Sequence, residues 1–349
     1  MDPLPVSFTR KVLIASAISL AVVLGVWFLF HTAQIVLLFY VGVLLALVLH
    51  AGAGVLGRYL RIPGVWSLVA FLLLLVAAFW LVGRLLAPPV ADQLNQLGDQ
   101  LPEAVERLEE RARQYPLVRR ALDQLPGAVE TVQQTDWLAG VRGLFSVTAA
   151  VLTGVAVFLA VGIYLAADPA AYTHVLVQLF PVARRRRIAA VLERLGHVLR
   201  MWLLGRALGM TFVGMLTAIG LFALDMPLAL ALGLIAGLLD FIPNIGPLLA
   251  AVPALLIALM EGPTLALYVA ALYLGIQALE GYLIVPLIEQ KVVRIAPALN
   301  VIGQILLTVM FGFLGLLLAT PLIVMLMVLV QELYIKDVLE AGRSRPEPG

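Results

Sequence analysis

Residues 228–260 read LALALGLIAGLLDFIPNIGPLLAAVPALLIALM, two apolar arms on either side of a polar, proline-rich centre at 240–247. Each arm, 228–240 and 248–260, has 13 residues and would be about 20 Å long as a helix. The hydrocarbon core of a bilayer is about 30 Å thick, so neither arm is long enough to cross it alone. The stretch therefore predicts a re-entrant helical hairpin that enters and leaves the membrane on one side.

The composition of the whole chain also indicates a membrane protein. Of the 349 residues, 62% are hydrophobic and only 13% are charged, whereas a soluble domain carries about 25% charged residues. Further apolar stretches of spanning length lie at 12–30, 33–50, 65–87, 147–166, 203–224 and 263–288. These runs lack the alternation of barrel strands, so we expect an all-α integral membrane protein, a polytopic helical bundle.

A second broken stretch runs over 297–330 and is interrupted around Gly312 and Gly315. The segments 203–260 and 263–333 thus share one plan, a full helix followed by a broken pair, and Pro227 and Pro297 lie at matching places. The first unit would start inside and the second outside, which predicts an inverted repeat of two re-entrant hairpins, as in many secondary transporters. The alternative is a pair of kinked helices with no transport role.

The division of the chain follows from these stretches. We expect a three-span membrane region over 1–87, a small extracytoplasmic helical segment over 88–146, a fourth span with a cytoplasmic basic amphipathic helix over 147–202, a transport core over 203–335 and a cytoplasmic tail over 336–349. In the 88–146 segment, Pro102, Pro116 and Pro126 predict several short helices. Its apolar stripe from Val90 to Leu108 belongs either to a solvated cap or to a subunit contact.

The distribution of arginines predicts the orientation. Arg58, Arg61 and the run Arg184–Arg187 flank apolar stretches, and such charges favour the cytoplasmic side. We therefore expect a multi-pass protein of the inner (cell) membrane with both termini in the cytoplasm. The apolar face of 182–202, ending at Trp202, predicts a helix lying on the inner leaflet. A membrane span next to the arginine run favours topology over nucleic-acid binding.

Ionisable side chains inside a membrane are costly, so those in the apolar stretches are the first candidates for a site. Asp240 lies at the predicted tip, where Pro243 and Pro247 remove two backbone donors and Gly246 permits a tight turn. Glu280 lies three residues after Gln277 on one helix face. The transport or ion-coupling candidates are Asp240, Pro243, Asn244, Gly246, Pro247, Gln277, Glu280, Gly281, Glu289, Arg206, Gly312 and Gly315.

Each charged candidate also has a structural interpretation. Asp240 could be a carboxylate at a water-exposed tip, and Glu289 could pair with a neighbouring base. Arg206 faces either the cytoplasmic entrance or an acidic partner. The chain has no cysteine, no Gly-x4-Gly-Lys-Ser/Thr motif and no His-Glu-x-x-His motif, so we expect no enzyme activity, cofactor or metal.

Several of these pieces together resemble the autoinducer-2 exporter family, also described as PerM-type permeases. The matching motifs are Tyr164 through Asp168, Asp240 through Pro247, Gln277 through Gly281, and Gly312 through Gly315. Asn244 stands where an aromatic residue is often found. The resemblance implies an oligomeric helical membrane protein, with pentamers in the family, and links to export of a quorum-sensing signal or to sodium or lithium/proton antiport.

The function that we expect is a secondary transporter of this type. It would move a small molecule or cation, outward and coupled to a proton or sodium gradient, within a homo-oligomer in contact with membrane lipid. A passive channel is the main alternative, because a pore needs no titratable group. A membrane scaffold and an intramembrane enzyme stay open as further alternatives.

Overall fold

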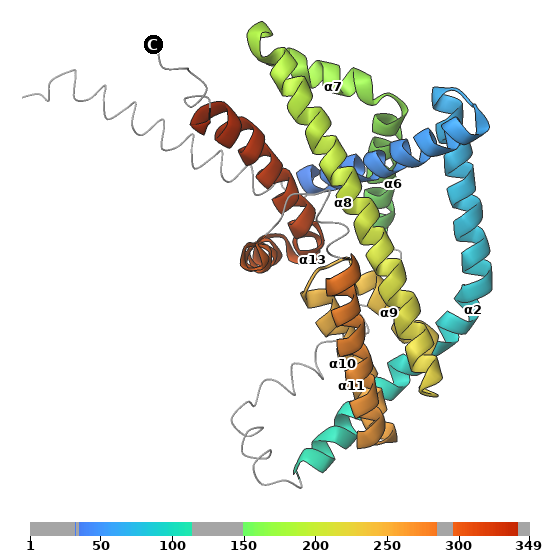
Figure 1. Cartoon of the computed structure of the whole chain (residues 1–349). Helices are drawn as coiled ribbons and strands as arrows, with labels where there is room; N and C mark the ends of the chain where they lie inside the picture. The colour runs from blue at the N-terminus through green and yellow to red at the C-terminus, as the bar shows by residue number, and fades with distance from the viewer. Residues whose placement is uncertain (1–31, 33–34, 114–148, 285–295, 341–349) are drawn as a thin grey trace, which may run out of the picture.

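The computed structural model describes residues 32, 35–113, 149–284 and 296–340, and every regular element within them is helical (Figure 1). The first helix, Ile35–Leu60, is followed by α2, Gly64–Arg113. The predicted span 12–30 and the candidates Glu289, Pro116 and Pro126 lie outside the described residues.

The middle of the chain contains α6 (Ala149–Ala167), α7 (Pro169–Gln178) and α8 (Val182–Ala223). Two short apolar helices follow, α9 (Ala229–Leu239) and α10 (Ile245–Glu261). Their bounds agree with the predicted arms to within three residues, and the interruption falls at 240–244 as expected.

The last part contains α11 (Pro263–Leu279), which continues as a π-helix, η1 (Glu280–Ile284). After the gap come α13 (Pro297–Leu329) and a second π-helix, η2 (Val330–Leu339). Five helices among the described residues are long and apolar enough to cross a membrane, and the bent pair α6–α7 raises this to six. The chain is therefore a multi-pass, all-helical membrane protein.

Two sequence expectations about helix ends are wrong. Helix α2 does not stop at Pro102 but continues to Arg113, and it curves along its length in Figure 1. A proline removes one donor and bends a helix, and it need not end a helix that is otherwise bonded and packed.

The basic segment 182–202 is the second correction, because it is the first half of α8 and continuous with the span 203–224. Its apolar face packs against protein. Val198, Leu199 and Trp202 form a core cluster with Leu37 of the first helix and with the second half of α13, including Val328. A single helix that crosses the membrane in its second half cannot lie in the membrane plane in its first half, so the predicted leaflet-bound helix is not found at this place.

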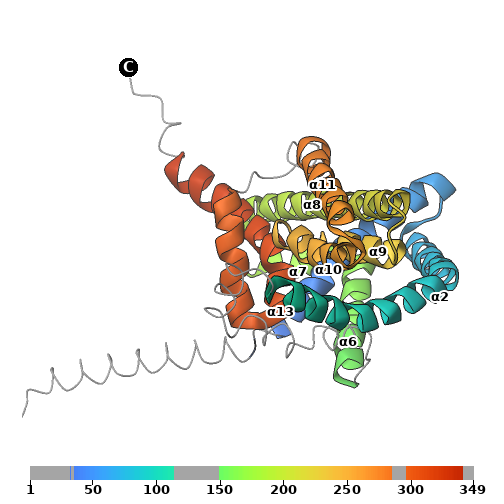
Figure 2. The same ribbon diagram turned by 90° about the horizontal axis from the view of Figure 1, so that it is seen from below.

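The main core joins α8, α9, α10 and α11 with one residue of α2. Leu97 of α2 is 1% exposed and belongs to this cluster, with Leu94 packed against it. Figure 2 shows α2 curving around α9 and α10 on the side away from α8 and α11. This part of the stripe from Val90 to Leu108 is thus intramolecular core, neither a solvated cap nor a subunit contact.

Helix α13 is folded back on itself at Gly312. This residue has φ 63° and ψ −144°, a left-handed conformation that favours glycine. The hydroxyl of Thr320 donates to Oδ1 of Asn300 at 3.1 Å, and Gly303 approaches the Ile323 side chain. In a straight helix, residues 20 positions apart would be separated by about 30 Å. The interruption predicted over 311–315 is therefore a turn between two halves that lie side by side.

Candidate functional site: a buried cluster of one arginine and two carboxylates

A glycine seam brings α9 close to α8. Gly233 and Gly237 of α9 lie against Ala218, Gly214 and the carbonyl of Met210 in α8, where an added Cβ would lie 2.6–2.7 Å from its nearest neighbour. Small residues allow helices to approach to backbone contact. The two helices run antiparallel in this register, so the next turn of α9 beyond Gly237 meets the preceding turn of α8, which carries Arg206.

That turn contains Asp240, and its carboxylate forms an ion pair with the guanidinium of Arg206. Oδ1 of Asp240 is 3.3 Å from Nη2 of Arg206. On the other side of the same guanidinium, Nη1 donates to Oε1 of Glu280 at 3.2 Å. One arginine therefore lies between two carboxylates that are 40 residues apart in the sequence. Of the two alternatives for Arg206, a cytoplasmic entrance or an acidic partner, the structure shows the acidic partner.

All three charged side chains are buried. Asp240 is 0% exposed, Glu280 is 6% exposed and Arg206 is 7% exposed. The alternative interpretation of Asp240 as a carboxylate at a water-exposed tip is thus wrong. In their ionised forms one positive and two negative charges give the cluster a net charge of −1. A buried charge is costly without a partner. The excess negative charge of the ionised cluster therefore favours uptake of a proton or a cation.

The hydrogen bonding of the cluster is incomplete. Both carboxylate oxygens of Asp240 and two nitrogens of Arg206, Nε and Nη2, have no hydrogen-bond partner among the described residues. The Arg206–Asp240 contact is close enough for an ion pair but is not aligned as a hydrogen bond. Gln277 supports the other carboxylate, since its Nε2 donates to Oε2 of Glu280 at 3.3 Å.

A change of helix type marks the position of Glu280. Helix α11 ends at Leu279, and the wider π-helix η1 starts at Glu280. Such π segments inside helices are frequent at functional sites because they displace side chains from the regular register. Gly281 follows, with open space where a Cβ would lie among the described residues.

The turn between α9 and α10 is fixed by its neighbours. Asn244 adopts φ 69° at the start of α10, and the carbonyl of Pro243 accepts a 3.1 Å hydrogen bond from Nε2 of Gln304 in α13. Phe241 packs edge-on against Trp202 of α8, with ring centroids 5.8 Å apart. Pro247 is in the first turn of α10, where its missing N–H costs little.

Gly246 has a different role from the one expected. It lies in helical conformation in the first turn of α10, and a Cβ there would overlap the carbonyl oxygen of Leu239. Gly315 is held in the same way at the other break, against the carbonyl of Leu307. Close backbone approach, and not turn geometry at Gly246 itself, therefore requires these two glycines.

Sequence reasoning missed a neutral polar cluster next to the charged one. Gln304 is 0% exposed, and its Nε2 also contacts Oγ1 of Thr320 at 3.4 Å, which in turn donates to Asn300. Oε1 of Gln304 has no hydrogen-bond partner among the described residues. The available signal was the four-residue spacing of Asn300, Gln304 and Thr308 on one face of an apolar helix.

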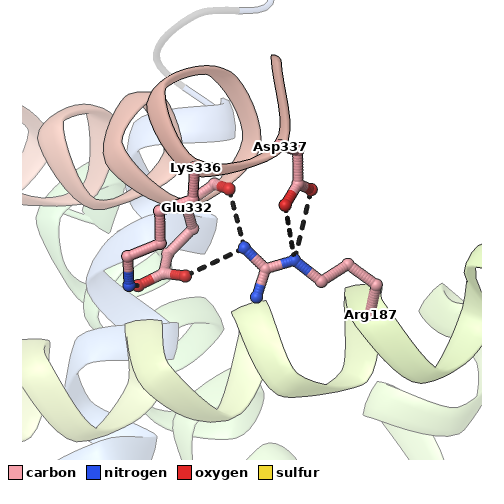
Figure 3. Close-up of polar contacts among 4 residues, drawn as sticks. All are labelled: Arg187, Glu332, Lys336 and Asp337. Atoms are coloured by element: carbon pink, nitrogen blue, oxygen red, sulfur yellow. Dashed lines mark hydrogen bonds and ion pairs between the residues drawn. The ribbon is translucent and has the colours of Figure 1, made fainter. Parts of the chain in front are cut away.

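A separate ion-pair network joins the first half of α8 to η2. Figure 3 shows Arg187 between Glu332 and Asp337, with Nη2 3.0 Å from Oε2 of Glu332 and Nε 3.0 Å from Oδ1 of Asp337. Lys336 also pairs with Glu332, at 2.6 Å. This network is partly exposed and continues the apolar contact between α8 and α13, so it clamps two elements and has no part in the buried cluster.

The chain matches the family model described as AI-2E family transporter over residues 17–335. The chain belongs to the AI-2E transporter family. The match contains every helix named above except the last four residues of η2, and it includes the three elements that supply Arg206, Asp240 and Glu280. The protein is therefore a membrane transporter and not an enzyme.

Curated relatives support membership of the AI-2E transporter family. YueF of Bacillus subtilis (strain 168), named for a proposed transport role, is 24% identical over 277 residues, which cover 75% of this chain and 74% of YueF. YrrI of the same organism is 30% identical over 152 residues, 44% of this chain and 43% of YrrI. A protein of Thermotoga maritima with a similar name is 28% identical over 123 residues.

Proposed function

We propose that this protein is a secondary transporter in which the Arg206–Asp240–Glu280 cluster exchanges a proton or sodium ion against its cargo, a small molecule or cation. The observation that carries the proposal is the burial of two carboxylates on a single guanidinium. A buried pair alone could be structural, but a second carboxylate leaves an excess negative charge that an arriving cation or proton neutralises.

The exchange follows from competition for Arg206. When one carboxylate takes up a proton or binds a cation, its attraction to the guanidinium falls, and Arg206 then pairs more strongly with the other carboxylate. Asp240 lies beside the turn of a helix pair, and Glu280 lies at the start of a π-helix. A change of partner at Arg206 would therefore act on two elements that are not continuous α-helices.

We assign the two broken stretches as re-entrant hairpins of an inverted repeat. Three features support this assignment. The halves of α13 contact each other, α9 and α10 share one core, and a glycine contacts an earlier leucine carbonyl at each break. The hydrogen bond from Gln304 to Pro243 joins the first half of α13 to the turn between α9 and α10, so the two broken stretches are in direct contact.

The direction of transport, the membrane topology and the oligomeric assembly belong to the same proposal. Arg58 and the run Arg184–Arg187 favour the cytoplasmic side of the inner membrane for the segments that carry them. On this basis we assign both termini to the cytoplasm and the end of α8 at Asp225 to the outside. We assign outward movement of the cargo and a homo-oligomer, a pentamer by family resemblance.

The test is transport by the full-length protein in proteoliposomes that contain a pH-sensitive dye. Addition of Na⁺, Li⁺ or K⁺ outside should move protons through the wild-type protein with at least one of these cations. Asp240→Asn keeps the size of the side chain but cannot titrate, so it should abolish this proton movement.

The matched control is Asp225→Asn, the same change at an exposed carboxylate beyond the end of α8. It should transport at the wild-type rate. Cation flux that moves no protons and is unchanged by Asp240→Asn would instead identify a passive channel. A wild-type protein that moves no protons with any of the three cations would contradict exchange of a proton against a monovalent cation at this cluster.

A further inference from the structure

The junction between α6 and α7 is a fixed right-angle corner. The two helices are bent by 88° across a break at Asp168. Asp168 caps α7 by accepting a hydrogen bond from the backbone N–H of Ala171 at 3.0 Å, and Pro169 occupies the first helical position. If α6 crosses the membrane, the corner places α7 parallel to the membrane plane (Figure 1).

Helix α7 carries an apolar stripe that nothing in the described part of the chain covers. Tyr172, Val175, Leu176 and Leu179 follow the i, i+3, i+4, i+7 spacing of one helix face, and they are 43%, 59%, 48% and 75% exposed. No residue of α7 is buried. A short helix whose apolar face stays exposed is typical of a segment lying in the membrane interface.

The neighbouring turn places this corner at the depth of the interface. A crevice of about 330 Å³ is lined by Arg58 and Gly64, at the turn between the first two helices, and by Ala166 and Ala167 at the end of α6. The turn and the start of α7 therefore lie at the same level. Tyr59 and Trp66 flank this turn and are 88% and 69% exposed, as expected of aromatic residues at a membrane–water interface.

Basic groups surround the corner without acidic partners. Arg58 lines the crevice and has neither an ion pair nor a hydrogen bond within the described ranges. His50 lines it too, with Nδ1 3.1 Å from the carbonyl of Ala166. Beyond the other end of α7, Arg184 and Arg186 are exposed and likewise unpaired among the residues that the structure describes. The corner thus offers positive charge at both ends of an apolar stripe.

We propose that the α6–α7 corner binds an anionic phospholipid, with the apolar stripe of α7 among the acyl chains and the headgroup phosphate in the crevice beside Arg58 and His50. The charge rule assigns this lipid to the cytoplasmic leaflet. The surface is separate from the Arg206 cluster, so the inference stands whether or not that cluster couples transport.

Depth quenching tests the position of α7. The sequence has no cysteine, so Leu176→Cys in the full-length protein can carry a single bimane label in vesicles of phosphatidylcholine and phosphatidylglycerol. Lipids with a nitroxide near the headgroup end of the acyl chain should quench this label. His174→Cys, on the opposite face of the same helix, should instead react with a water-soluble thiol reagent and resist quenching. Equal behaviour of the two positions would contradict an interfacial α7, and would point to a second copy or another segment as the cover.

Lipid selectivity tests the crevice. Native mass spectrometry of the purified protein should show bound phosphatidylglycerol in preference to phosphatidylcholine. Arg58→Gln should lower this preference about fivefold, the effect of one basic residue near an anionic surface. Arg61→Gln is the matched control, because Arg61 is on the same turn but does not line the crevice, and it should keep the preference.

Competition with inorganic phosphate distinguishes a lipid headgroup from free phosphate as the ligand of the crevice. Inorganic phosphate should fail to displace phosphatidylglycerol from the wild-type protein at millimolar concentration, because it lacks the acyl chains that α7 would hold. Displacement by phosphate alone, or an unchanged preference in Arg58→Gln, would overturn the lipid site.

Discussion

Arg206 is the residue on which the charged cluster depends. It is the cation that both Asp240 and Glu280 contact, and all three side chains are buried. Removing one carboxylate leaves a neutral pair, whereas removing the guanidinium leaves two negative charges facing each other. The consequences of substitution at the three positions should therefore be strongly unequal.

The first prediction concerns the stability of Arg206→Gln. Loss of one partner from a buried ion pair costs about 3–5 kcal/mol, and here two carboxylates lose their partner. Thermal unfolding in detergent should show Arg206→Gln to be much less stable than the wild type, while Asp240→Asn stays close to it. Arg194→Gln, at an exposed position of the same helix, should have no measurable effect. A stable Arg206→Gln protein would mean that the carboxylates are already protonated in the resting state.

The second prediction concerns Gly246→Ala. The added Cβ would meet the carbonyl oxygen of Leu239, a backbone atom that cannot rotate away. Overpacking of this kind costs about 1–3 kcal/mol and should displace the turn that holds Asp240. Gly275→Ala is the matched control, since a Cβ there meets nothing within 4 Å among the described residues and replaces glycine within a helix. Melting temperatures in detergent should fall for the first variant and rise or stay level for the second.

At the scale of the element, the helices that hold the site depart from regular geometry. Helix α13 turns back at Gly312, α11 widens into a π-helix at Glu280, and α9 ends at Asp240. Two of these departures, at Glu280 and Asp240, fall on carboxylates of the charged cluster. Breaks of this kind expose backbone groups that regular helices would satisfy internally, so they favour sites that bind and release a ligand.

The third prediction tests the fold of α13. Asn300→Cys with Thr320→Cys should be joined by a short bifunctional thiol reagent in membranes, because the two native side chains are hydrogen-bonded at 3.1 Å. The pair Asn300→Cys with Val309→Cys separates the two thiols by about 14 Å along one arm and should not be joined by the same reagent. Absence of the 300–320 cross-link would show that α13 is a single kinked crossing and would remove the second hairpin from the proposed repeat.

At the scale of the whole molecule, two layers of contact hold the halves of the chain together. The core of α8 to α11 includes Leu97 from α2, and the second cluster joins the first helix to α8 and α13. The Arg187 network extends this second contact beyond the apolar region. The charged cluster in turn joins α8, the end of α9 and the start of η1.

The fourth prediction tests the topology that these layers imply. If α9 and α10 form a re-entrant hairpin, the end of α8 and the end of α10 lie on one side of the membrane. Asp225→Cys and Glu261→Cys should then both react with an impermeant thiol reagent from outside, and Arg58→Cys only from the cytoplasm. Asp225 and Glu261 are both exposed, so neither should be protected by protein. Labelling of the two positions from opposite sides would replace the hairpin by one kinked crossing.

Hydropathy and residue spacing were enough to predict the class of this protein, the positions of its apolar stretches and the two breaks. The sequence also identified Asp240, Glu280 and Arg206 as unusual charges, because hydropathy, spacing and proline or glycine content are local properties of the chain. The bounds of α9 and α10 could be predicted for this reason.

Which of these residues contact one another could be learned only from the packing of the helices. The pairing of Arg206 with two carboxylates depends on the close approach of Gly233 and Gly237 to α8, a contact between surfaces that no local pattern specifies. The same holds for the apolar face of 182–202, whose periodicity fits a lipid surface and a protein core equally well. Long-range packing chose between those two partners.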